Sequence, residues 1–190
     1  MSTDVFLPGF ADPVGGAQSA FRAVLGAMSC PGSLHAAGEN LTPPAPLDPA
    51  TAAVLLALVD GESPVSLDPA AAPARAWIAF HCGAAFDASA RFVLALSCPD
   101  LASLSAGSHE APEDSCTLVL QVRALGTGAG FRVYGPGLRA PRIFAVDGLP
   151  ADFAARWQAN HALFPRGVDV VLCAGTQLAA LPRSAQLEDS

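Results

Sequence analysis

Lysine is absent from this 190-residue chain, and all ten of its basic residues are arginine. The absence excludes chemistry that needs a Schiff-base lysine, including the covalent attachment of pyridoxal phosphate. It also excludes the lysine of a P-loop. The formal net charge is −7 and no stretch is rich in arginine. We therefore expect neither DNA nor RNA as a partner.

Clustered cysteine and histidine are also missing. The five cysteines stand singly at positions 30, 82, 98, 116 and 173, without a CxxC pair or a His-rich zinc spacing. We predict reduced thiols, no metal site and no cofactor. A cytoplasmic location is expected, because no signal-peptide pattern opens the chain. The longest strongly apolar run, 52–59, is too short to cross a bilayer, so no membrane partner is expected.

Apolar residues, in contrast, are abundant. Hydrophobic residues make up 52% of the chain and charged residues only 14%. This balance predicts a large core under a thin charged coat, with apolar surface left for a partner chain to cover. A compositional bias of the source genome towards alanine and proline would explain the same figures without a partner.

The hydrophobic periodicity predicts one mixed α/β domain over residues 17–190, with helices on both faces of a largely covered sheet. Residues 1–16 are loosely patterned, and we expect them to be partly disordered. The elements are listed in chain order: helix 17–30, helix 48–60, strand 64–67, strand 75–82, strand 91–97, short helix 98–107, strand 116–125 opening a hairpin that ends at 134, helix 149–164, and a final hairpin 168–181.

Two helices carry specific expectations. In the first, Phe21, Val24, Leu25 and Met28 follow the spacing i, i+3, i+4, i+7, which predicts one buried stripe. In the second, Asp48 stands directly before Pro49 and is predicted to cap the helix.

The final hairpin carries the most specific pair of charges. Its two apolar runs flank Gly175–Thr176, which suits a two-residue type II′ turn. That register pairs position 168 with 183, so Arg166 and Arg183 lie at one end and on one face of the ribbon. Two like charges there favour an anion: a ligand, a carboxylate of another chain, or a carboxylate of this chain such as Asp169 or one from the 110–114 loop. Asp169 faces the other side of the ribbon in this register, which weakens it as the partner.

Three further residues are candidates for binding. His81 is expected at the end of strand 75–82, where ligand groups often lie in open α/β sheets, although a hydrogen-bonded structural histidine is the more ordinary role. Glu113 belongs to an acidic loop that is either simply solvated or a contact for arginine. Arg22 lies outside the first helical stripe and can join Arg183 in an anion site. No catalytic residue is predicted, because no triad or metal-ligand set is recognisable.

Seven motifs occur in the order and rough spacing of the PhnH family, the H subunit of the bacterial carbon–phosphorus lyase system. They are "FRAVLGAMSCPG", "LLALVDGESPV", "FHCGA", "HEAPEDSCTLVLQV", "YGPGL", "FPRGVDVVL" and "LAALPRS". Each motif alone is weak, but seven in order are specific, and the chain resembles the family from about Phe21 to Ser184. Asp169 and Arg183 fall on the FPxGxD and LPR patterns, whereas Arg166 falls on the open x position.

The resemblance implies a function in phosphonate breakdown. The family acts with the G, I and L proteins to transfer the ribose triphosphate of ATP onto methylphosphonate, with release of adenine. It implies a core complex with G, I and J, and a homodimer when isolated. It also implies a fold like a cut-down pyridoxal-phosphate-dependent transferase that has lost the cofactor. Whether the subunit is accessory, or itself binds a phosphorylated substrate or nucleotide through its arginines, stays open at this point.

Overall fold

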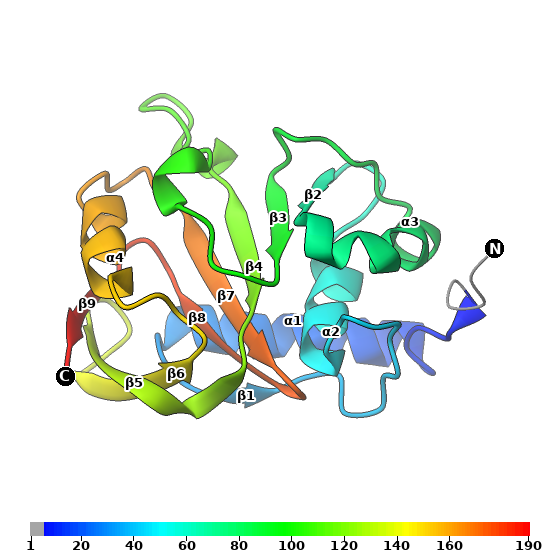
Figure 1. Cartoon of the computed structure of the whole chain (residues 1–190), viewed down its shortest axis with the longest axis horizontal. Helices are drawn as coiled ribbons and strands as arrows, with labels where there is room; N and C mark the ends of the chain where they lie inside the picture. The colour runs from blue at the N-terminus through cyan, green and yellow to red at the C-terminus, as the bar shows by residue number, and fades with distance from the viewer. Residues whose placement is uncertain (1–5) are drawn as a thin grey trace.

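The larger of two sheets organises the fold. The computed structural model describes residues 6–190. Within them the strands form a six-stranded sheet, in the order β1-β8-β7-β4-β3-β2, and a three-stranded sheet, in the order β6-β5-β9 (Figure 1). The strands are β1 His35–Ala36, β2 Val65–Leu67, β3 Phe92–Ala95, β4 Thr117–Gln121, β5 Ala124–Tyr134, β6 Arg142–Asp147, β7 Asp169–Ala174, β8 Gln177–Leu181 and β9 Gln186–Asp189. The helices are α1 Pro13–Ser29, α2 Pro49–Leu58, α3 Arg75–Cys82 and α4 Phe153–His161, with 3-10 turns η2 Pro69–Ala74, η3 Leu101–Ser103 and η4 Pro112–Asp114.

Four strands, β2, β3, β4 and β7, run parallel, so the six-stranded sheet has an amino edge where they begin and a carboxyl edge where they end. β8 lies antiparallel on β7, and β1 lies antiparallel on β8. The strands are apolar on both faces because both faces are covered. Val119 and Val171 pack in the core with α1, α2 and α3, while Leu118 and Leu120 pack in the core with α4 and the small sheet. The prediction of a mixed sheet with helices on both faces is confirmed.

The first helix begins at Pro13, four residues earlier than predicted. The side chain of Asp12 accepts hydrogen bonds from the backbone N–H groups of Val14 and Gly15, which is the expected function of an N-cap. Residues 1–5, which belong to the segment 1–16 that we expected to be partly disordered, lie outside the described residues. The helix therefore includes residues that the sequence pattern assigned to a loose segment.

The predicted buried stripe of this helix is wrong for two of its members. Phe21 is 50% exposed and Leu25 is 56% exposed. The buried face instead carries Ala20, Ala23, Val24 and Ala27, and small side chains allow the helix to lie close to α2 and β8. The large apolar residues are left on the outside.

Residues 75–82 form helix α3 and not the predicted strand. An eight-residue apolar run does not distinguish a buried strand from a buried helix. The flanks decide here: the carboxylate of Asp68 caps the η2 turn that leads directly into α3, and Gly83 ends the helix in the left-handed region at φ 65°. Ile78 and Cys82, four residues apart, are buried, whereas Phe80 is 65% exposed. His81 consequently lies on a helix and not at the end of a strand.

The predicted hairpin over 117–134 is also wrong. β4 belongs to the six-stranded sheet and β5 to the three-stranded one. Between them the Val122 N–H donates to Cys173 O in the large sheet and the Arg123 N–H donates to Asp147 O in the small one. The glycine-rich stretch that indicated a turn lies inside β5, where the register with β6 shifts between Leu125 and Ala129.

The final hairpin is confirmed in detail. β7 pairs with β8 from Val170–Leu181 to Ala174–Gln177, which leaves Gly175 and Thr176 as the two-residue turn. Gly175 adopts a φ of 55°, as the first central position of a type II′ turn requires. None of the helices in the described part of the chain is long and apolar enough to cross a membrane.

Candidate functional site

Arg183 lies just beyond β8, at the amino edge of the sheet. Its backbone N–H donates to Asp169 Oδ1 at 2.7 Å, and its Nε lies 3.1 Å from each carboxylate oxygen of Asp169. Nη2 also donates to Asp169 Oδ2, and the two side chains are only 17% and 15% exposed. Asp169 is therefore the partner of Arg183, contrary to the orientation that the ribbon register predicts. The register stops applying because strand pairing ends at Leu181.

The same guanidinium holds the acidic loop. Arg183 Nη1 donates to the carbonyl oxygen of Pro112 at 2.7 Å. From the other side Arg91 donates to Asp114 Oδ1 at 2.7 Å and to the carbonyl oxygen of Glu113 at 3.3 Å. The predicted contact between this loop and arginine is present, but Glu113 contributes its backbone and not its carboxylate.

Arg166 lies outside the paired strands, because β7 begins only at Asp169. Its backbone N–H donates to Leu163 O in the turn after α4, and Gly167, at φ 122°, redirects the chain towards β7. Among residues 6–190 the buried Arg166 Nε has no hydrogen-bond partner. Arg166 is therefore not part of the β7–β8 ribbon, and its placement on one face with Arg183 stays a prediction.

Two residues at the end of α4, not among the binding candidates, complete this edge. The buried amide of Asn160 donates to Val168 O at 2.9 Å and accepts from Val168 N at 2.8 Å. His161 Nδ1 lies 2.9 Å from Arg183 O, so its N–H donates to that carbonyl. Their spacing from the buried Trp157 places both residues on one helical face, which the sequence shows. The sequence does not show their hydrogen-bond partners.

His81 and Arg22 lie on other elements. His81 Nε2 is 3.0 Å from Leu7 O, and Trp77 Nε1 donates to the same carbonyl at 2.8 Å, so α3 fixes the segment before α1. Arg22 is exposed on α1. The structure thus brings Arg183, Asp169 and the backbone of the Glu113 loop together, and it places His81 and Arg22 on α3 and α1.

A cavity lies at the opposite, carboxyl edge. We call it the carboxyl-edge crevice, and its volume is about 680 Å³. It is lined by Asp48, Leu96, Ser97, Cys98, Gln121, Val122, Arg123, Gly148, Leu149 and Pro150. Asp48 directly precedes α2, and residues 96–98 follow β3. Residues 121–123 end or follow β4, and residues 148–150 follow β6. Ligands of open α/β sheets bind at this edge.

Gln121 fixes one wall of the crevice. Its Oε1 accepts from Asp48 N and from Thr51 Oγ1, both at 2.8 Å, and its Nε2 donates to Pro46 O at 2.8 Å. The prediction that the Asp48 side chain caps α2 is wrong, because this side chain makes no hydrogen bond to the first turn of the helix. Its Oδ2 instead accepts from Gly175 N at 2.9 Å. The start of α2 is therefore tied to β4 and to the β7–β8 turn.

Hydrogen bonding and burial shift the pKa values of ionisable groups at the crevice. Arg123 donates through Nε and Nη2 to the two carboxylate oxygens of Asp147, at 2.9 and 2.6 Å. This hydrogen bonding lowers the pKa of Asp147 and raises that of Arg123. Burial raises the pKa of the Cys98 thiol to about 11, so the thiol is neutral and a poor nucleophile.

The buried cysteines are also poor nucleophiles. Burial raises the pKa of Cys82 and Cys116 to about 12, as it does for Cys173. No group of three or more His, Cys, Asp or Glu residues within 6–190 is placed to hold a metal ion.

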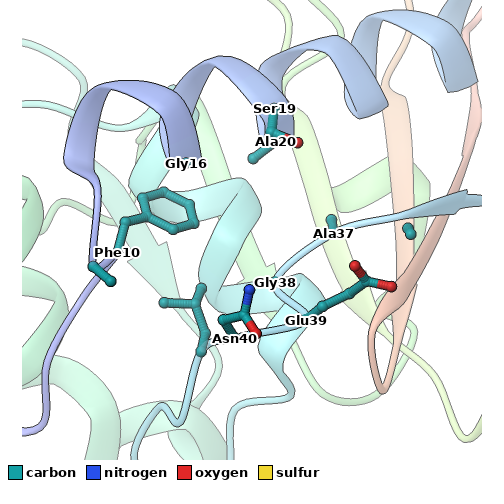
Figure 2. Close-up of a pocket in the computed structure, with 11 residues that line it drawn as sticks. Phe10, Gly16, Ser19, Ala20, Ala37, Gly38, Glu39 and Asn40 are labelled. Carbon is teal, nitrogen blue, oxygen red and sulfur yellow. The ribbon is translucent and has the colours of Figure 1, made fainter.

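A smaller pocket of about 190 Å³ lies between α1 and the 36–41 loop, where Figure 2 shows the Phe10 ring below Gly16 and across from Asn40. It falls below the 300–1,000 Å³ typical of ligand sites.

Comparison with known proteins decides the family. Residues 8–188 match the family model described as "Bacterial phosphonate metabolism protein (PhnH)". The chain belongs to the PhnH family. It is 39% identical over 194 residues to the "Alpha-D-ribose 1-methylphosphonate 5-triphosphate synthase subunit PhnH" of Rhizobium meliloti (strain 1021), an alignment that covers 98% of this chain and 97% of that protein. It is 35% identical over 81 residues, 43% of this chain and 42% of the relative, to the "Putative C-P lyase subunit protein HtxG" of Stutzerimonas stutzeri. The PhnH resemblance read from the seven motifs is confirmed.

Proposed function

We propose that this chain is a subunit of the carbon–phosphorus lyase core complex. In that role it is required, with the G, I and L proteins, for transfer of the ribose triphosphate of ATP onto methylphosphonate and release of adenine. Family membership and the name of the Rhizobium meliloti relative support this assignment. We place the complex, with its G, I and J subunits, in the cytoplasm.

One observation carries the proposal of a subunit role: an apolar stripe on α1 that residues 6–190 leave uncovered. Val14, Phe21 and Leu25 are 69%, 50% and 56% exposed. Their spacings of seven and four residues place them on one helical face, opposite the buried alanines. We refer to these three residues as the α1 stripe. Exposed apolar side chains gathered on one face are characteristic of interaction surfaces.

Within the complex the α1 stripe contacts another subunit, and in the isolated chain it joins two copies into a homodimer. We assign the chain surface and not catalysis, because no group of three or more His, Cys, Asp or Glu within 6–190 is placed to hold a metal and burial raises the pKa of the Cys82, Cys98, Cys116 and Cys173 thiols. The isolated protein is therefore expected to release no adenine from ATP.

The assembly experiment uses Leu25→Asp in the full chain, coexpressed with its partner subunits. A charge in the middle of the stripe is expected to abolish co-purification, and with it adenine release measured by chromatography. Ile143→Asp is the matched control, since Ile143 is 63% exposed on β6. Equal loss in both variants would reject the α1 stripe as the contact. Adenine release by the isolated chain would reject the accessory role.

Arg183 has a bracing role in this proposal, and the contacts around it support bracing over ligand binding. Its guanidinium already donates to Asp169 and to Pro112 O, which leaves it little capacity to bind an anion. Arg166, Arg22, His81 and Glu113 are likewise assigned structural or surface roles. Direct binding of a phosphorylated substrate by Arg183 would be revealed by an Arg183→Lys variant that keeps its stability and assembly but loses affinity for ATP.

We also propose that the fold is a reduced form of the pyridoxal-phosphate-dependent transferase fold that no longer takes the cofactor. The absence of lysine supports this, because no internal aldimine can form. Purified protein mixed with pyridoxal phosphate is expected to show no reducible aldimine absorbance, and such absorbance would reject the idea.

A further inference from the structure

We propose that the carboxyl-edge crevice is a binding site for a small neutral or positively charged molecule that donates a hydrogen bond to Asp48. This site is separate from the α1 stripe, and it does not depend on assembly with other subunits. Failure of the assembly experiment would leave it standing, and the converse also holds.

The size and position of the crevice favour a small molecule. A volume of about 680 Å³ lies within the range of ordinary ligand sites. The crevice opens where β3 and β4 end, which is the edge at which parallel sheets place their ligands. Leu96, Val122 and Leu149 supply apolar contact surface along its walls.

Asp48 supplies the hydrogen-bond acceptor. Gln121 fixes its backbone N–H, and Gly175 N–H fixes its Oδ2. Its other oxygen, Oδ1, accepts no hydrogen bond from residues 6–190, and since Asp48 lines the crevice we assign this oxygen to the ligand. A carboxylate held rigidly with one free oxygen is suited to an amine, amidine or hydroxyl donor.

The charges around the crevice determine which sign of ligand charge is favoured. Within the described chain, the carboxylates that line it, or that act on its lining residues, outnumber the guanidinium groups. They are Asp48, Asp68, Asp100, Asp147 and Asp152, against Arg123 and Arg156. An anionic ligand would meet net repulsion there, whereas a cation or neutral donor would not.

Arg123 does not reverse this conclusion. Both Nε and Nη2 are occupied by Asp147 in a two-point ion pair. The start of α2 does not provide an anion site either, since Pro49 has no N–H and Ala50 N already donates to Gly175 O. A triphosphate or phosphonate is therefore not the expected occupant of the crevice.

Three probes of nearly identical shape test the sign directly: benzamidine, benzamide and benzoate, which carry charges of about +1, 0 and −1 at neutral pH. Backbone amide signals of residues 96–98 and 121–123 are followed by NMR in the full chain as each probe is added. We expect benzamidine to bind with a dissociation constant of about 1–10 mM, as befits so small a ligand. Benzamide should bind more weakly, and benzoate at least about tenfold more weakly than benzamidine.

The variant Asp48→Asn assigns the acceptor. The asparagine oxygen can still accept from Gly175 N–H, so the fold is retained while the charge is removed. Benzamidine affinity is expected to fall at least about fivefold and benzamide affinity less than about twofold. Glu110→Gln is the matched control, because it also removes one negative charge but lies in the exposed loop at the other edge of the sheet.

Three outcomes would overturn the proposal. Benzoate could bind as tightly as benzamidine, which would mark an anion site. Asp48→Asn could lose no more benzamidine affinity than Glu110→Gln, which would exclude Asp48 as the acceptor. The signals of 96–98 and 121–123 could also fail to respond to any probe up to about 20 mM, well above the expected dissociation constant.

Discussion

The two edges of the six-stranded sheet use their polar residues in opposite ways. At the amino edge the Arg183–Asp169 pair is largely buried, and Arg183 donates to the Asp169 carboxylate and to the Pro112 carbonyl, so the pair connects the hairpin to the loop before β4. At the carboxyl edge Gln121 forms the tie between elements, and a cavity of about 680 Å³ remains beside it. The arginines that stand out in the sequence thus close one edge, while the residues that line the open edge were not among the sequence candidates.

Removing the carboxylate at the closed edge is expected to have the largest effect. Asp169→Ala leaves the largely buried Arg183 guanidinium without its counter-ion, which costs about 3 kcal/mol. In a chain of this length that corresponds to a fall in Tm of about 6–12 °C. Thermal unfolding followed by circular dichroism measures it. A fall as small as that of a surface substitution would show that the amino edge is not held by this pair.

The tie at the open edge comes next. Gln121→Leu leaves Asp48 N, Thr51 Oγ1 and Pro46 O without their shared partner, and Thr51 is fully buried. We expect a loss of about 2 kcal/mol in urea unfolding. Increased amide hydrogen exchange should be confined to residues 46–52, and an equal increase in the 105–115 loop would contradict the independence of the two edges.

Arg183→Lys separates charge from geometry at the closed edge. Lysine keeps the positive charge but cannot hold Asp169 and Pro112 O together with a planar fork. We expect a loss of about 1–2 kcal/mol, smaller than that of Asp169→Ala, with assembly and adenine release unchanged. Unfolding of both variants in parallel gives the comparison, and an equal loss would mean that the charge contributes nothing.

Asp68 connects the ends of β2 and β3 at the open edge and should make the stability depend on pH. Its pKa is lowered, first by the hydrogen bond from Ala70 N and also by those from Leu96 N and Ser97. A lowered folded-state pKa stabilises the protein above the unfolded value of about 3.9, and this contribution is lost as the pH falls through the folded pKa. Asp68→Asn should therefore lose less stability than the wild type between pH 5 and pH 3. Identical pH profiles would show that these bonds do not favour the charged form.

Arg123→Gln should have the smallest effect of all. The Arg123–Asp147 pair resembles the Arg183–Asp169 pair in geometry, but its side chains are 74% and 39% exposed. Water and salt screen such a pair, so we expect no measurable change in Tm. A clear loss of stability would show that exposure does not separate the two pairs.

The features that sequence reasoning obtained are local ones. The β7–β8 hairpin followed from Gly175 and two β-rich runs, because the turn fixes its own register. Helix α3 was missed because an eight-residue apolar run fits either element until its flanking Asp68 and Gly83 are considered. The glycines of β5 indicated a turn, since a bulge and a turn draw on the same residue.

The sites were harder to predict because their contacts are distant in sequence. Asp48 and Gln121 are 73 residues apart, and no pattern near either one indicates the other. Arg183 was identified from its position at the hairpin end, but its partner depended on where strand pairing stops, which alternation alone does not reveal. The seven ordered motifs succeeded for another reason: they identify the family without specifying any contact.

The short strands at both edges of the large sheet have a consequence for self-association of the protein. β1 is two residues long and β2 three, so neither edge presents a row of free backbone groups long enough to template a foreign strand. Within residues 6–190 the large sheet is therefore a poor template for a growing cross-β assembly, and the six-residue β6 of the small sheet is the longest edge strand that remains.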